Sequence, residues 1–122
     1  MNKPISYQIQ NSILIRTFYG EVYLQDLIDS VEYMVEHSIV TEELTSMISD
    51  FTQASFLLTK EETQHLRTLI LKYPLSIGHL NFIQIIPTPN IAKTMIFKEQ
   101  NPDINTRSFS TIKGAMDWLA HV

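Results

Sequence analysis

The sequence predicts a single α/β domain in which helices pack on one mixed, mostly parallel sheet. Strand-like and amphipathic helical segments alternate along the chain, which is the pattern of βαβ units. One segment, LNFIQII at 80–86, is nearly all apolar, as expected of a strand that is covered on both faces. We therefore expect a five-stranded mixed sheet with four helices in the order ββαβαβαβα, and one domain over residues 1–122.

Two strands open the chain, at Tyr7–Gln10 and Ile13–Tyr19, and the pair Asn11-Ser12 between them predicts a hairpin. In the second strand, alternate side chains face opposite sides of the sheet, with Ile13, Ile15 and Thr17 on one side and Leu14, Arg16 and Phe18 on the other.

An amphipathic helix is predicted from about Tyr23 to His37, and a third strand at Leu44–Asp50. The apolar residues of the helix recur at the spacing of a single stripe: Leu24, Leu27, Ile28, Val31, Met34 and Val35. Acidic residues occupy its other faces, namely Asp26, Asp29, Glu32 and Glu36.

The second half of the chain continues the alternation. Pro74 ends the second helix, because proline disfavours helical geometry at the residue before it. The fifth strand is the more polar one and is expected at an edge of the sheet. The predicted elements are a helix at Lys60–Tyr73, a strand at Leu80–Ile86, a helix at Pro89–Glu99, a strand at Asn105–Ser110 and a helix at Thr111–Ala120.

Helix starts carry clear local signals. Thr59 and Glu62 have the spacing of a capping box, in which each side chain satisfies the backbone amide of the other residue. Thr88-Pro89 offers a cap followed by a proline at the first helical position, and Ser110 or Thr111 can cap the last helix.

Composition and charge exclude several functional classes. The net charge is −4, and the six bases after residue 62 are dispersed, which argues against a nucleic-acid partner. No apolar run reaches the roughly 18 residues that a membrane span needs. The first residues lack the apolar middle of a signal peptide, so we expect a cytoplasmic protein.

No known reactive motif is present. The chain has no cysteine, no nucleophile elbow and no phosphate-binding glycine loop. The four histidines are scattered and show no zinc-site spacing. We therefore predict no catalytic residue, no cofactor and no metal, and a protein that is not an enzyme.

The strand-to-helix junction from Asp50 to Thr59 is the candidate regulatory or partner-binding site. Asp50 is expected to end the third strand and to accept hydrogen bonds from the amides that follow it. The apolar run Phe56, Leu57 and Leu58 is either an exposed interface or a loop that folds back into the core. Thr59 is expected to act as the helix cap.

Several of these features resemble the STAS-type fold, and specifically the SpoIIAA-like family of small bacterial proteins. They are Gly20 before an acidic helix, the strand ending at Asp50, the Thr59 capping box, and the segments IQIIPTPNIAKTMIF at 83–97 and FSTIKGAMDWLAHV at 109–122. The resemblance implies a five-stranded sheet with four helices, and does not imply an enzyme. Related anti-anti-sigma proteins carry a DSSG-like motif with a phosphorylatable serine. The chain reads FLLTKEE there, and Thr59 is closest to that serine's position.

The predicted function is a non-catalytic binding or regulatory module that acts through protein contacts near the second helix. Its partner is another protein, with a homodimer as one form of the contact. The alternatives are a small-molecule or lipid-binding domain, with an apolar pocket beneath Phe56, and an enzyme whose site carries no recognisable motif.

Overall fold

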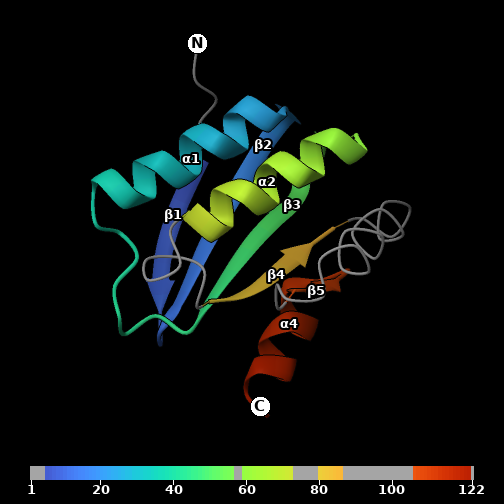
Figure 1. The fold of residues 1–122 in the computed structure, drawn as a ribbon. Coiled ribbons are helices and arrows are strands. Elements are labelled where there is room, and N and C mark those ends of the chain that lie inside the picture. Colours follow the sequence, from blue (N-terminus) through green and yellow to red (C-terminus); the bar gives the residue numbers. More distant parts are fainter. Residues whose placement is uncertain (1–4, 57–58, 73–79, 87–105, 122) are drawn as a thin grey trace.

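The computed structural model describes residues 5–56, 59–72, 80–86 and 106–121. In chain order these residues form β1 (Ile5–Gln10), β2 (Ile13–Val22), α1 (Leu24–Glu36), β3 (Ser46–Phe56), α2 (Lys60–Lys72), β4 (Asn81–Ile85), β5 (Thr106–Phe109) and α4 (Ile112–Leu119) (Figure 1).

The five strands form one sheet in the order β1-β2-β3-β4-β5. The first pair is antiparallel and the other three pairs are parallel, which confirms the mixed, mostly parallel sheet. The β1–β2 hairpin turns at Asn11 and Ser12, whose φ angles of 50° and 66° are those that a two-residue turn of type I′ requires. β5 lies at an edge, as its polarity predicted.

Three helices lie in the described part of the chain, whereas the sequence predicted four for the whole chain. The predicted helix at 89–99 lies outside the described residues, so the complete order ββαβαβαβα is not observed. The described order is ββαβαββα, and each of its elements overlaps the predicted one.

The helices cover both faces of the sheet. Figure 1 shows α1 and α2 running alongside each other across one face, with α4 beneath β4 and β5. Side chains of α1 join one core cluster with Leu14, Met47 and Phe82, whereas Ala115 of α4 joins a second cluster with alternate residues of the same strands. The second cluster contains Ile13, Ile15, Ile48, Ile83 and Ile85. β4 is therefore covered on both faces, as predicted.

The third strand is longer than predicted, and the expectation that it ends at Asp50 is wrong. β3 continues to Phe56, because β2 also continues to Val22 and supplies a parallel partner for the extra residues. The pairing shifts register between Thr17 and Tyr19, so that β3 carries an additional residue there, as in a β-bulge. The carboxylate of Asp50 accepts hydrogen bonds from the backbone amide and the hydroxyl of Thr52, at 2.9 and 2.7 Å.

Candidate functional site

A row of polar side chains crosses the sheet on the face that α1 and α2 cover. Strand pairing aligns one residue from each strand: Tyr7 with Arg16, Arg16 with Ser49, Ser49 with Gln84, and Gln84 with Ser108. We call these five residues the polar row. It is unusual because the neighbouring positions on the same face are apolar and form the core.

Arg16 is the centre of the polar row. Its side chain is only 6% exposed. One terminal nitrogen, Nη1, donates to Oγ of Ser30 in α1 at 2.9 Å, and the other, Nη2, donates to Oγ of Ser49 at 2.9 Å. The hydroxyl of Tyr7 completes the network through a 2.8 Å hydrogen bond with Ser30. The network around this guanidinium thus links three strands and the first helix.

The remaining surroundings of Arg16 are aromatic. Its guanidinium carbon lies 4.7 Å from the centroid of the Phe18 ring, which in turn stacks on Phe51 with centroids 4.8 Å apart. Such contact between a cation and a ring stabilises the charge by about 0.5–2 kcal/mol. The Nε atom of Arg16 is buried and has no hydrogen-bond partner within the described residues.

Burial lowers the pKa of Arg16 to about 10, and the phenol of Tyr7 acts in the opposite direction. Desolvation has this effect because it disfavours the charged form of a base. The guanidinium still carries its charge at neutral pH, since the lowered pKa lies well above 7. Over the described ranges, no carboxylate forms an ion pair with it.

The sequence contains a signal for this network, although the network was not among the predicted sites. Alternation in β2 places Arg16 on the same face as Leu14 and Phe18, which are both buried. Ser30 likewise stands between Leu27 and Val31 in the apolar stripe of α1 and is 2% exposed. A cation and a hydroxyl that both interrupt apolar stripes are candidates for contact with each other. The alignment of Ser49 requires the strand register, which the sequence does not reveal.

A second feature lies where the helices begin. Val22 pairs with Phe56 at the ends of two parallel strands, so α1 and α2 start at the same end of the sheet. The backbone amide of Tyr23 donates to the Asp26 carboxylate at 2.7 Å. The phenol hydroxyl of Tyr23 donates to the Glu21 carboxylate, also at 2.7 Å. The hydrogen bond to Glu21 raises the pKa of the exposed Tyr23 phenol, and the negative charge of Glu21 acts in the same direction.

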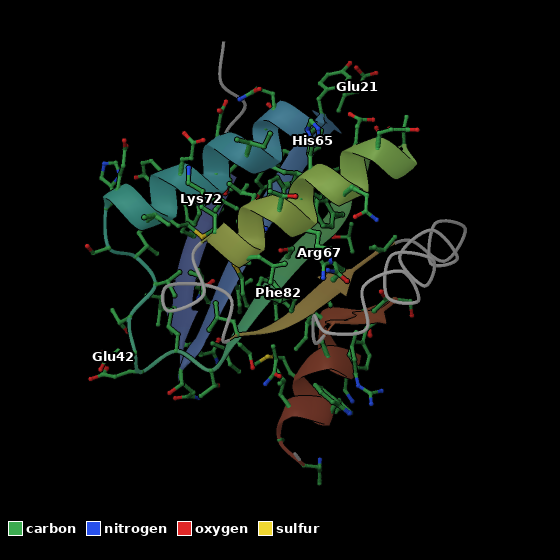
Figure 2. All side chains as sticks on the ribbon, in the orientation of Figure 1. Glu21, Glu42, His65, Arg67, Lys72 and Phe82 are labelled. Atoms are coloured by element: carbon green, nitrogen blue, oxygen red, sulfur yellow. The ribbon has the colours of Figure 1, made fainter. Side chains whose placement is uncertain are left out.

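The predicted capping box at the start of α2 is present. The Thr59 amide donates to the Glu62 carboxylate at 3.0 Å, and the Glu62 amide donates to the Thr59 hydroxyl at 3.1 Å. Figure 2 shows Glu21 and His65 at this same end of the molecule. The helix starts thus form a polar surface beside the exposed ring of Tyr23.

Among the predicted site residues that the structure describes, Asp50 is separated from Phe56. Asp50 lies six residues before the end of β3, about 20 Å of extended chain from Phe56. Phe56 belongs to β3 and not to a loop, while Leu57 and Leu58 lie outside the described residues. The expectation of an apolar pocket or patch at this run therefore stays a prediction.

Neither a metal site nor a membrane-spanning helix is found in the part of the chain that the structure describes. These residues contain no group of three or more His, Cys, Asp or Glu side chains that could hold a metal ion. Among the same residues, no helix is long and apolar enough to cross a membrane.

Comparison with known proteins identifies the fold. The chain is similar to the anti-sigma factor antagonist SpoIIAA in its unphosphorylated form, with a TM-score of 0.57, 14% identity, and coverage of 98% of this chain and 100% of that one. It is also similar to an uncharacterised protein from Shewanella loihica with a SpoIIAA-like fold, with a TM-score of 0.57, 16% identity, and coverage of 95% and 92%.

The phosphorylated form of the Bacillus cell fate determinant SpoIIAA gives a TM-score of 0.50 at 12% identity over 95% of this chain and 99% of that one. No protein-family model matches the sequence, and no curated protein is a detectable relative of it. The structural likenesses confirm the SpoIIAA-like, STAS-type fold that the sequence predicted.

Proposed function

We propose that this protein is a non-catalytic regulatory module that binds a partner protein at the end of the sheet where α1 and α2 begin. The observation that carries this proposal is the pairing of Val22 with Phe56, which places the two helix starts at one end of the sheet. Tyr23 presents a side chain there that is 60% exposed. Tyrosine is among the residues that most often anchor protein interfaces.

The charge at this end supports a partner with a basic surface. Four acidic residues stand at or near the two helix starts: Glu21, Asp26, Glu61 and Glu62. The only lysine or arginine beside them in the sequence is Lys60. Opposite charge on a partner speeds association, and the rate then falls as salt is added.

The fold likeness supports a regulatory role. SpoIIAA is an anti-sigma factor antagonist, and structures exist of its unphosphorylated and phosphorylated forms. In the present chain we assign Thr59 to the helix cap and not to a phosphorylation switch. A phosphate there would meet the like charges of Glu61 and Glu62, which oppose a dianion.

The proposed contact includes self-association. A second copy of the chain is the first partner to test, and sedimentation of the purified protein measures it directly. We also propose that the protein works in the cytoplasm.

The experiment compares Tyr23→Ser with Tyr33→Ser as a matched control. Both tyrosines are exposed, but Tyr23 is the cap residue before α1 and Tyr33 lies near the other end of the helix. Serine is a good helix cap, so Tyr23→Ser should fold normally. Proteins captured from the native host by the wild type are identified by mass spectrometry, and the dissociation constant of the purified partner is then measured for each variant.

We expect Tyr23→Ser to weaken binding at least tenfold, and binding by the wild type to weaken as salt rises. Tyr33→Ser should bind like the wild type. Loss of binding in Tyr33→Ser with full binding in Tyr23→Ser would place the interface elsewhere. If no protein or second copy binds the wild type specifically, the proposal fails.

A further inference from the structure

The network around Arg16 is incomplete in a specific way. A guanidinium has five N–H groups, and Arg16 uses two of them in hydrogen bonds, both to neutral hydroxyls. Its Nε–H is buried without a partner among the described residues. The charge is thus solvated by two serine oxygens and one aromatic face, and not by any carboxylate in that part of the chain.

This arrangement is costly for the folded protein. A buried charge without an opposite charge is strongly disfavoured, and buried N–H groups are nearly always paired in native proteins. A group with one negative charge and at least one acceptor atom beside Nε would remove both deficits, the unbalanced charge and the unpaired N–H. We propose that Arg16 is the centre of a buried binding site for a small monovalent anion.

The other members of the network suit an anion. Hydroxyls can donate as well as accept, so Ser49 can turn its O–H toward a bound anion while the guanidinium keeps its position. Tyr7 and Ser30 share a hydrogen bond, so one of the two donates to the other and only the remaining O–H is available to an anion. The Phe18 ring covers one side of the guanidinium, so an anion would approach in the plane of the group, where the N–H donors point.

Charge and size select the class of ligand. Arg16 supplies one positive charge, so a monovalent anion leaves the site neutral, whereas a dianion would leave an uncompensated negative charge in the core. The side chain is 6% exposed beneath α1, which restricts the ligand to a few atoms. Formate and acetate match the planar donor edge of a guanidinium, and chloride matches its charge alone.

The first experiment measures thermal unfolding of the full-length protein at constant ionic strength, while chloride, formate, acetate or phosphate replaces a reference anion. Arg16→Met is the control, because methionine fills a similar volume without charge. General salt effects on the fold should act on both proteins alike.

We expect formate, acetate or chloride to raise the melting temperature of the wild type in a saturable way. The rise is about 10 °C at a hundred times the dissociation constant, and Arg16→Met should show none of it. If the two proteins respond identically, the anions act on the whole surface and the proposal is wrong. A response of the wild type to phosphate alone, measured above the second pKa of phosphate where the ion is a dianion, would contradict the monovalent assignment.

The second experiment needs no variant. The ¹⁵N–¹H signal of Arg16 Nε is followed by NMR while sodium formate, acetate or chloride is added, in separate titrations, to the wild-type protein. We expect a saturable change of this signal with the midpoint found by melting. A signal that stays constant up to high concentrations of all three anions means that Nε is satisfied by a buried water or by the protein itself, and it overturns the proposal.

Discussion

Arg16 occupies a position that its neighbours fill with apolar side chains. Leu14 and Phe18 share its face of β2, and both are almost fully buried. Three contacts make the arginine tolerable there: the Phe18 ring beside the guanidinium and the hydroxyls of Ser30 and Ser49. Because those serines come from α1 and β3, the arginine links the helix to the sheet.

The link between Arg16 and Ser49 is testable by a double-mutant cycle. We predict that Ser49→Ala destabilises the wild type by about 1–3 kcal/mol, because it leaves an Nη–H group buried without a partner. In the Arg16→Met background the same change should cost less than about 0.5 kcal/mol, since the hydroxyl then has no cation to solvate. Urea unfolding measures all four proteins. Equal costs in both backgrounds would show that the hydrogen bond contributes nothing to stability.

The lowered pKa of Arg16 predicts a pH dependence with a definite sign. Burial holds the folded-state pKa at about 10, below that of the unfolded chain. From pH 6 to 9 both states keep the proton, so the difference in unfolding free energy between wild type and Arg16→Met should be constant. Above about pH 10 the unfolded state binds more protons, so the wild type should gain stability relative to the variant.

Denaturant melts of both proteins at several pH values, in one non-binding buffer anion, test this. If the difference in unfolding free energy between the two proteins changed with pH between 6 and 9, a group of the network would titrate near neutrality, contrary to the prediction.

At the scale of elements, the helix starts show how local sequence fixes local structure. α2 begins with a capping box between Thr59 and Glu62, and α4 begins with Thr111, whose hydroxyl accepts a hydrogen bond from the Gly114 amide at 3.1 Å. Both caps satisfy amides that a helix start otherwise leaves without partners. The two threonines are therefore a natural pair for comparison.

We predict that Thr59→Ala and Thr111→Ala each lower the unfolding free energy by about 1 kcal/mol. Neither change should alter partner binding or self-association, because each removes only a cap. Denaturant melts and analytical ultracentrifugation are the measurements. If Thr59→Ala abolishes association at unchanged stability, Thr59 is a regulatory residue, as the position nearest to the serine of SpoIIAA-like proteins would suggest.

At the scale of the whole molecule, stability depends on a sheet that is buried on both faces. Ile83 illustrates this, because it is 1% exposed and lies in the core cluster between the sheet and α4. Phe82, the residue before it, belongs to the cluster on the opposite face, and Figure 2 shows it on β4 below α2. One strand thus joins the two halves of the core.

We predict that Ile83→Asp unfolds the domain, since a buried charge without a partner costs several kcal/mol. The control is Ile112→Asp, at an exposed position that opens α4, where a carboxylate interacts favourably with the helix dipole. Circular dichroism melts should show a folded control and an unfolded Ile83 variant. A normal melting curve for Ile83→Asp would contradict the two-sided core.

The sequence by itself determined the features that depend on short-range periodicity and local chemistry. The stripe of α1, the hairpin at Asn11-Ser12 and the capping box at Thr59 were all predicted, because each is encoded within a few consecutive residues. The burial of β4 on both faces followed from its composition, and the polarity of β5 placed it at an edge.

Tertiary structure decided what depends on register between distant segments. β3 passes Asp50 and runs to Phe56 because the extended end of β2 offers backbone partners, which the local sequence of β3 does not reveal. The same pairing aligns Ser49 with Arg16, and packing of α1 adds Ser30. A residue's neighbour across a sheet is fixed by hydrogen bonds between strands, so the surroundings of Arg16 exist only in the folded chain.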